Sequence, residues 1–447
     1  MPVCVRSGLV SVRGVSLARN RYASDAYRFL DELVKREECS RRNIEARQVI
    51  GLQRIWELAR ANSPFYRKYW PVKLSGFMEW SQLPLLSRDV VRRMAPAMMN
   101  ETVRRGEQIW VSTTGTTGSS IRVCYTRAVM RRNWAFRMQQ FLWAGISPHC
   151  PRITAFGSRV VPSRQKSPPF WVHNIAENQI FISIYHLSHS SAADYITFLK
   201  RHDSSVVEGF PSAVGILADF VLAAGELVRM RAVFTDGEPL SLVLRHKIER
   251  AFSCRVYNTY GNTELCGLIQ QCDYQNMHVN PDYGFLEIVD EEGCPVRPGQ
   301  TGYFVWTGFI NESMPLLRYK IGDRGAWLTS QECACGRKSL LVDPGVSRES
   351  ELLYAADGRI FSPRAVNQLL KSATTFRFCQ FVQSKNSHVL IRAVGAAAGA
   401  GQELAGIRQR MMAMLGQGTT VDIELASEPI VTRGGKTPLV VREPFGC

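Results

Sequence analysis

The sequence predicts an α/β protein: a large domain of layered sheets and helices, followed by a small α+β domain. Helical and strand patterns alternate between residues 128 and 258, which is typical of α/β layers. Strand and turn patterns replace the helices from 280 to 330 and predict a β-rich subdomain. A turn at 343–345 then precedes a strand, helix, strand, strand, helix and strand pattern. We therefore expect a large domain over 1–343 and a small one over 344–447.

Length and composition agree with this division. The 447 residues exceed the roughly 100–200 of a usual domain, so several domains are expected. No apolar run reaches the ~18 uninterrupted residues of a membrane-spanning helix, so we expect no span. The 12 cysteines are scattered, which indicates a reducing cytoplasm rather than a disulfide scaffold. An arginine-rich start without an unbroken apolar core argues against a targeting segment, and we expect residues 1–43 to be poorly ordered.

The charge of the chain narrows the class of partner. The formal net charge is +16, and the stretch 108–176 holds nine Arg and Lys residues without one Asp or Glu. Such a stretch attracts polyanions. No reading helix, finger or stacking platform accompanies it, which disfavours nucleic acid. A phosphate-bearing small molecule or an acidic carrier protein fits better.

The elements can be placed from periodicity. An amphipathic helix is predicted over 44–61, ending at Ser63 and Pro64. Two strands, 109–111 and 121–125, flank a turn rich in Ser, Thr and Gly. The other elements before 280 are helices at 128–143 and 211–224 and strands near 153–156, 205–207, 230–234 and 255–258.

Two motifs follow predicted strands. Ser112–Ser120 reads STTGTTGSS, in which glycines let backbone amides approach an anion and hydroxyls add donors. It lacks the ending of a P-loop, and it fits a phosphate cradle or an ordinary polar loop. Tyr260–Glu264 follows the strand at 255–258, at the sheet edge where α/β proteins bind ligands. Thr263 and Glu264 could hold a phosphate and Mg²⁺, or simply cap a helix.

Two further motifs lie near the predicted linker and the C-terminus. In Arg318–Asp323 the acid could accept hydrogen bonds from a ribose diol, or the segment could be a surface turn. Lys436 follows Gly434 and Gly435 on a flexible turn, from which its ammonium could reach a developing negative charge. Each motif alone says little, but their order and spacing together are specific.

Taken together, the chain resembles the adenylate-forming superfamily of acyl coenzyme A synthetases, in the branch of phenylacetate coenzyme A ligase and related capsule-biosynthesis proteins. The resemblance runs from about Leu52 to Val441. Its register rests on four motifs: Ser63–Tyr66, Leu83–Arg88, Glu208–Ser212 and Thr235–Leu240.

The resemblance implies a nucleotide site and a mobile C-terminal lid. It implies ATP and Mg²⁺ as cofactors, with Glu264 on the metal and Thr263, Glu264 and Lys436 as catalytic residues. The implied nucleotide-binding residues are Thr113, Thr114, Gly115, Thr116, Thr117, Gly118, Gly237, Glu238, Tyr260, Gly261, Asp323 and the hinge residue Arg348. Phe210, Tyr257 and Tyr260 are expected to line an acyl pocket, although core packing explains Tyr257 equally well.

The chain departs from the family pattern at two places. Ser119 and Ser120 stand where the phosphate loop usually continues into Pro and often Lys, and Ser347 replaces the Gly before the hinge arginine. The hinge acid aligns with Glu351 or with Ser350. Phosphate binding and hinge freedom are the properties that these changes affect.

One Cys/His set has the spacing of metal ligands. Cys272 and His278 form a Cys-x5-His pair, and Cys333 and Cys335 form Cys-x-Cys. Tetrahedral zinc accepts three thiolates and one imidazole, and buried free thiols are the alternative. The resemblance favours a structural zinc, since some members of the branch hold one here.

The function expected from the resemblance is activation of a carboxylic acid as an acyl-adenylate, followed by transfer to coenzyme A. Aromatic pocket residues favour an aryl or arylacetic acid. An amine, hydroxyl or carrier-protein acceptor is the alternative, and a catalytically silent nucleotide or nucleic-acid binding protein is a third. The oligomeric state stays open, with a homodimer among the candidates.

Overall fold

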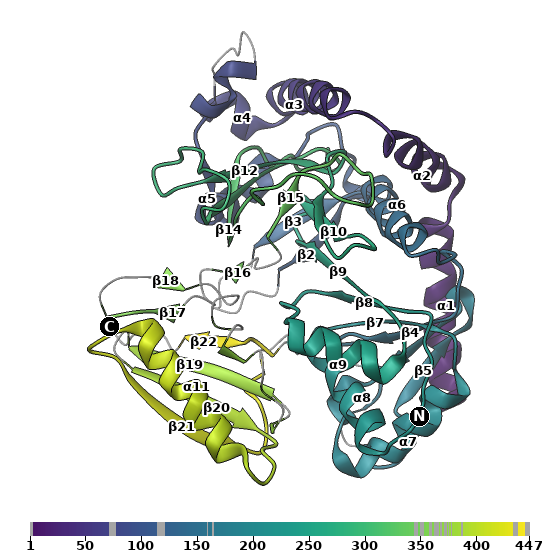
Figure 1. The fold of residues 1–447 in the computed structure, drawn as a ribbon. Helices are drawn as coiled ribbons and strands as arrows, with labels where there is room; N and C mark the ends of the chain where they lie inside the picture. The colour runs from purple at the N-terminus through teal and green to yellow at the C-terminus, as the bar shows by residue number, and fades with distance from the viewer. Residues whose placement is uncertain are drawn as a thin grey trace. The chain divides into compact units, whose positions relative to one another are not determined.

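The structure is a computed structural model. It describes residues 3–70, 77–113, 121–158, 160–162, 165–343, 347–348, 353–356, 360–361, 366, 369–370, 373, 375–376, 378–385, 388–431 and 437–442. Two compact units divide the chain. The first contains Met1–Ser11, Cys150–Asn258 and Gly345–Cys447, and the second contains Val12–His149 and Thr259–Pro344. The α/β class predicted from the sequence is confirmed, since helices and strands are both abundant (Figure 1).

The N-terminal segment, for which the sequence predicts poor order, contains two helices. Helix α1 covers Val3–Arg21 and helix α2 covers Ser24–Arg36. In α2 the apolar residues Ala26, Leu30 and Leu33 recur at helical spacing and are buried against Ala135 and Phe136 of helix α6. This packing attaches α2 to α6.

The second unit contains most of the other N-terminal helices. The predicted helix at 44–61 lies within α3, whose N-terminus is capped because the Ser40 side chain accepts a hydrogen bond from the Asn43 amide. The helices of this unit after α2 are α3 (Arg41–Asn62), α4 (Pro64–Tyr69), α5 (Arg88–Met98) and α6 (Arg127–Trp143), with 3₁₀ turns η1 (Phe77–Gln82) and η2 (Arg105–Glu107).

Three strand assemblies build the rest of the second unit. One sheet has the strand order β1-β14-β13-β12. In a second set of paired strands, the end of β9 pairs with β10, β10 with β11, and β11 with β15. The third assembly is the hairpin of β2 and β3. The strands are β1 (Leu86–Ser87), β2 (Ile109–Ser112), β3 (Arg122–Tyr125), β9 (Val256–Gly261), β10 (Leu268–Gln271), β11 (Met277–Val279), β12 (Gly284–Val289), β13 (Gly302–Gly308), β14 (Tyr319–Gly325) and β15 (Leu341–Val342).

The first unit contains a largely parallel sheet. Its strands follow the order β8-β7-β4-β6-β5, in which only the β5–β6 pair is antiparallel. Gly209 at the end of β7 has no room for a side chain, because a Cβ there would lie 2.8 Å from the Cβ of Ala155 on β4. The strands are β4 (Arg152–Ala155), β5 (Trp171–Asn174), β6 (Gln179–Ile182), β7 (Val206–Gly209) and β8 (Ala232–Asp236).

Helices cover this sheet (Figure 1). Buried residues of α8, such as Val214 and Leu217, share one apolar core with Ile153 of β4 and Val207 of β7. The helices are α7 (Ala192–Arg201), α8 (Pro211–Ala223) and α9 (Leu242–Phe252), with 3₁₀ turns η3 (Ile175–Glu177), η4 (Ile184–His186) and η5 (His189–Ser191).

The C-terminal part of the first unit has an apolar core of its own. Leu404, Ile407, Met411 and Leu415 of helix α11 are buried in it, and Figure 1 shows this helix lying across the sheet β21-β20-β19-β22. The elements are β16 (Ser347–Arg348), β17 (Leu353–Tyr354), β18 (Ile360–Phe361), β19 (Phe378–Lys385), β20 (His388–Val394), α11 (Ala400–Leu415), β21 (Thr420–Ala426) and β22 (Val440–Arg442).

The compact units are discontinuous, so the division into 1–343 and 344–447 stays a prediction. None of the helices in the described part of the chain is both long and apolar enough to cross a membrane.

Candidate nucleotide site and metal cluster

The end of strand β9 carries the Tyr260–Glu264 motif on a braced turn. The Asn262 side chain donates to the Gly267 carbonyl at 3.1 Å and accepts from the Cys266 amide at 3.0 Å. Leu265 has a φ of 53°, so the chain reverses tightly there. The turn therefore holds Thr263 and Glu264 in a defined place after the strand.

Asp323 lies beside Tyr260. The Tyr260 hydroxyl donates to Asp323 Oδ2 at 2.6 Å, and Asp323 is 5% exposed. Burial, followed by the neighbouring Asp323 carboxylate, raises the pKa of Tyr260 well above its ordinary value, so the phenol remains a donor. Since Asp323 is on strand β14, the surface-turn interpretation of its motif is wrong.

Glu264 is a buried carboxylate. It is 3% exposed, and its Oε1 accepts a hydrogen bond from the Tyr319 hydroxyl at 2.9 Å and lies 3.8 Å from Arg88 Nη1. Burial raises the pKa of Glu264, and Arg88 and Tyr319 oppose that rise. A cation at this carboxylate would relieve the cost of burying its charge.

Tyr319 and Arg88 were not among the predicted site residues. Tyr319 stands in the Arg318–Asp323 motif, so the alternation of β14 could have pointed to it. Arg88 ends the Leu83–Arg88 motif, which shows no obvious chemistry in the sequence. Its guanidinium also donates to the Ile321 carbonyl at 3.1 Å, which fixes it beside β14.

The hairpin of β2 and β3 bears the predicted phosphate loop. The Thr113 amide donates to the Ile121 carbonyl at 2.8 Å, and the Ile121 amide donates to Thr113 Oγ1 at 2.9 Å, so the base of the loop is closed. Tyr125 of β3 donates to the Thr263 carbonyl, which ties this hairpin to the end of β9. Thr114, Gly115, Thr116, Thr117 and Gly118 lie outside the described residues.

Gly237 and Glu238 follow strand β8 in the first unit. Gly237 has a φ of 79°, which favours glycine. Glu238 accepts hydrogen bonds from the Ser212 amide at 3.0 Å and from the Thr437 amide at 2.8 Å. Glu238 therefore links the Thr235–Leu240 motif to the residue that follows Lys436 in the sequence. Lys436 and the Arg348 side chain lie outside the description.

The predicted pocket aromatics of the first unit differ in burial. Tyr257 is 5% exposed and stacks on the buried Phe234 with ring centres 5.3 Å apart, so it packs in the core. Phe210 is half-buried, and its ring meets Phe156 edge to face at 5.1 Å. Tyr260 belongs to the second unit, where it stacks on Trp306.

The predicted Cys/His set is gathered in the second unit. The ligand atoms of Cys272, His278, Cys333 and Cys335 all lie within 4.8 Å of one another. Sγ of Cys272 is 3.7 Å from Sγ of Cys333, and Sγ of Cys335 is 3.4 Å from Nε2 of His278. Tetrahedral zinc bonds imply about 3.8 Å between two sulfurs and about 3.5 Å from sulfur to nitrogen.

The surroundings of the cluster suit a metal. His278 Nδ1 lies 2.9 Å from Ser339 Oγ, an outer contact that leaves Nε2 facing the thiols. Burial and nearby Arg337 lower the pKa of His278 to about 4, so the imidazole is neutral at pH 7, the state that binds metal. The Asn276 side chain donates to Cys333 Sγ at 3.2 Å. The four ligands therefore fit one closed zinc site.

Comparisons with known proteins agree with this architecture. The family model described as "AMP-binding enzyme" matches residues 180–310. Protein CapK of Staphylococcus aureus is 25% identical over 97% of this chain and 96% of its own. A phenylacetate-coenzyme A ligase of Thermus thermophilus is 24% identical over 75% of this chain and 76% of its own.

Solved structures share the fold. A crystal structure of 2-hydroxyisobutyryl-CoA ligase in the postadenylation state matches with a TM-score of 0.72 at 17% identity, covering 92% of each chain. The amide bond synthetase McbA of Marinactinospora thermotolerans matches with a TM-score of 0.52 at 13% identity, covering 76% of this chain and 68% of its own.

Proposed function

Because this chain belongs to the adenylate-forming superfamily of ligases, in the branch of phenylacetate-coenzyme A ligase and CapK, we propose that it activates a carboxylic acid with ATP and Mg²⁺. The product of this step would be an acyl-adenylate, and pyrophosphate would leave. Transfer of the acyl group to coenzyme A would follow.

One observation carries the proposal. The Tyr260–Asp323 hydrogen bond of 2.6 Å and the Glu264–Tyr319 hydrogen bond of 2.9 Å join two motifs separated by more than fifty residues. The buried carboxylates of Asp323 and Glu264 thus lie beside the end of strand β9, and α/β proteins bind nucleotides at such strand ends. This supports Asp323 as the acceptor for a ribose diol and Glu264 as the magnesium ligand.

Glu264 suits Mg²⁺ by its chemistry. Its carboxylate is buried, keeps acceptor capacity beyond the single tyrosine hydroxyl, and has a pKa raised by burial, so a hard cation would stabilise its ionised form. When bound, Mg²⁺ would neutralise charge on the triphosphate.

The remaining residues would bind and orient the substrates. Thr113 through Gly118 would hold phosphate oxygens, Thr263 would contact the α-phosphate, and Gly237, Glu238, Tyr260 and Gly261 would contact the nucleoside. A substrate carboxylate oxygen would attack the α-phosphorus in line as the bond to pyrophosphate breaks. Lys436 would stabilise the charge that develops in this step. No covalent bond to the enzyme is required.

The transfer step would need the C-terminal residues to move. We propose that the 344–447 domain rotates about Arg348 and the following acid, Glu351 or Ser350 in alignment, so that Lys436 withdraws before the acceptor enters. Two separate apolar cores support this rotation: one is formed by residues between 153 and 256, and the other by residues between 353 and 440.

We also propose a class of acid and a class of acceptor. The half-buried Phe210 and its neighbour Phe156 support an aryl or arylacetic acid, as the name of phenylacetate-coenzyme A ligase also suggests. Transfer to an amine is the second candidate, since the amide bond synthetase McbA shares the fold. A hydroxyl group or the thiol of a carrier protein could attack the acyl-adenylate in the same way.

Pyrophosphate release tests activity and acceptor together. Purified protein is incubated with ATP, Mg²⁺ and a panel of aryl, arylacetic, hydroxy and fatty acids, with and without coenzyme A. We expect acid-dependent release that one class of acid dominates and that coenzyme A accelerates. Acceleration by amines instead would favour the second candidate, and release with no acid dependence would contradict the proposal.

Lys436→Ala tests the assigned step. Because Lys436 is proposed to act on developing charge, the rate of adenylation should fall by about a hundredfold to a thousandfold while ATP binding is kept. Acid-dependent pyrophosphate exchange and equilibrium ATP binding measure the two properties. Undiminished exchange would remove Lys436 from the proposed chemistry.

We also propose that Cys272, His278, Cys333 and Cys335 hold one structural zinc, supported by their mutual distances within 4.8 Å. Four protein ligands leave no open coordination position, so the metal would stabilise the fold. Such thiolates keep their ligand role in a reducing cytoplasm, which is the compartment we propose.

A further inference from the structure

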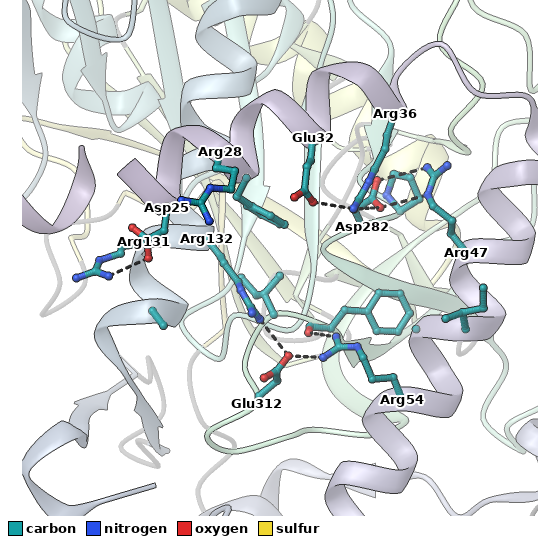
Figure 2. A pocket seen from close by; sticks show the side chains of 17 residues that line it. Asp25, Arg28, Glu32, Arg36, Arg47, Arg54, Arg131, Arg132, Asp282 and Glu312 are labelled. Atoms are coloured by element: carbon teal, nitrogen blue, oxygen red, sulfur yellow. Dashed lines mark hydrogen bonds and ion pairs between the residues drawn. The ribbon is translucent and has the colours of Figure 1, made fainter. Parts of the chain in front are cut away.

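A cavity of about 540 Å³ opens in the second unit (Figure 2). Residues of α2, α3 and α6 and of the segments 281–282 and 309–312 line it, and none belongs to the candidate nucleotide site or to the metal cluster. Its volume lies within the roughly 300–1,000 Å³ of small-molecule sites. The charged lining consists of six arginines and four acids: Arg28, Arg36, Arg47, Arg54, Arg131, Arg132, Asp25, Glu32, Asp282 and Glu312.

Carboxylates hold the arginine head groups in place. Asp282 Oδ1 lies 3.1 Å from Nη1 of Arg36 and 3.4 Å from Nε of Arg47. Glu312 accepts from Arg132 at 3.0 Å and from Arg54, which also donates to the Phe309 carbonyl at 2.8 Å. Figure 2 shows that each group joins two helices: Arg36 of α2 and Arg47 of α3 meet at Asp282, and Arg132 of α6 and Arg54 of α3 meet at Glu312. The guanidinium groups are thus positioned before any ligand arrives.

The pairing leaves positive charge in excess. Six arginines exceed four carboxylates by two, and the Arg28 side chain makes no hydrogen bond or ion pair with any residue in the described part of the chain. The paired side chains also remain accessible, with exposed fractions of 35% for Arg36 and 39% for Arg132. Guanidinium groups bind carboxylate or phosphate oxygens in a bidentate manner, so an anion could still engage them.

The cavity also has an apolar wall. Ile50 of α3 is 62% exposed at the cavity, and Phe309 and Ile310 are 5% and 2% exposed behind it. Gly51 lets α3 approach this wall closely, because a Cβ there would lie 3.0 Å from the Phe309 ring. An organic group resting on Ile50 would be removed from water.

We propose that this cavity binds a small phosphate monoester, with the phosphate among the arginines and the organic group against Ile50. A phosphate monoester carries about −1.5 to −2 charges at pH 7, which matches the excess of two arginines. A monocarboxylate would neutralise only half of that excess. The proposal does not depend on the proposed ligase function.

Calorimetric titration of the full chain with phenyl phosphate tests the proposal. We expect one phenyl phosphate per chain, weaker binding of inorganic phosphate because it lacks the apolar group, and no binding of phenol. Arg28→Gln should weaken phenyl phosphate binding about tenfold, since one charge-assisted contact is lost. Arg28 is exposed and its side chain has no hydrogen bond or ion pair to break, so the variant should fold normally.

A control variant locates the binding. Lys35→Gln, an exposed cation of the same helix outside the cavity, should bind phenyl phosphate as the wild type does. The proposal is overturned if wild-type protein binds no phenyl phosphate, if Arg28→Gln binds it equally well, or if Lys35→Gln weakens the binding as much as Arg28→Gln does.

Discussion

At the end of β9, two buried carboxylates, Asp323 and Glu264, each accept a hydrogen bond from a tyrosine hydroxyl. In the Cys/His cluster of the same unit, four ligand atoms lie within 4.8 Å of one another. In the first region a tyrosine hydroxyl and the Arg88 guanidinium at 3.8 Å compensate only part of the cost of burying Glu264, and the second region gathers four ligand atoms of the kinds that tetrahedral zinc binds. The Glu264 carboxylate can therefore accept a further hydrogen bond or coordinate a cation, whereas four ligands around one zinc would leave no open coordination position.

This difference separates function from stability. Burial of an incompletely neutralised carboxylate destabilises the fold but prepares a binding site, as expected where function and stability conflict. A closed metal site does the reverse, since metal binding contributes directly to folding. Substitutions at the strand end should mainly change activity, and substitutions in the cluster should mainly change stability.

Glu264→Gln should produce the largest effect. Loss of the carboxylate should lower adenylation kcat/KM by on the order of a thousandfold. Stability should hold or rise, because the folded-state pKa of Glu264 lies above its ordinary value and ionisation at pH 7 opposes folding. Pyrophosphate exchange and urea unfolding measure the two properties.

A matched control for Glu264→Gln is Glu287→Gln. Glu287 also has a pKa raised by burial, but it pairs with Arg318 at 2.9 Å, so its loss leaves a buried guanidinium without its carboxylate. This control should lower stability and keep the adenylation rate of the folded protein. Equal effects of the two variants on exchange would contradict the separate roles.

Cys335→Ser tests the cluster. Loss of one zinc ligand should remove the metal and lower the unfolding free energy by on the order of 3 kcal/mol, while the rate per folded molecule changes little. Metal analysis and thermal unfolding check this. Cys294→Ser, at an exposed cysteine, is the control and should keep both metal and Tm. A wild-type protein without zinc would remove the basis of the prediction.

Asp323→Ala should come next. If the carboxylate accepts two ribose hydroxyls, KM for ATP should rise by about a hundredfold, with a smaller change in kcat, because these contacts are made before the reaction. Initial rates over a range of ATP concentrations measure both constants. An unchanged KM would show that the ribose is bound elsewhere.

Tyr260→Phe should have the smallest effect. The variant keeps the ring contacts with Trp306 and Phe304 but loses the 2.6 Å hydrogen bond to Asp323, so KM for ATP should rise about fivefold. In the Asp323→Ala background the same substitution should have almost no effect. Additive effects of the two substitutions would contradict the coupling.

The two compared regions also differ in how far sequence could predict them. The cluster was predictable as a set because Cys272–His278 and Cys333–Cys335 are close pairs of rare ligands. The pairing of Tyr260 with Asp323 was not, since 63 residues separate them and only the fold sets their distance. Arg88 is likewise far from Glu264 in the sequence, whereas Tyr319 shares its motif and its strand with Asp323 and could be predicted from the alternation of that strand.

The strand and helix order was largely predictable, and the exceptions have physical causes. Alternating apolar patterns located α3, α6, α8 and the strands around them, and local capping by Ser40 or Thr126 fixed where helices begin. The N-terminal helices are harder to predict, because the arginines that dominate the first residues obscure the helical spacing of Ala26, Leu30 and Leu33. The arginine cavity combines distant helices, which no local pattern reveals.

A single-turnover experiment tests the central claim most directly: enzyme in excess over ATP, with Mg²⁺ and the preferred acid, quenched and analysed by mass spectrometry. We predict an acyl-adenylate that forms together with pyrophosphate and disappears when coenzyme A or another acceptor is added. Consumption of ATP to ADP and phosphate, with no acyl-adenylate at any time, would contradict the account.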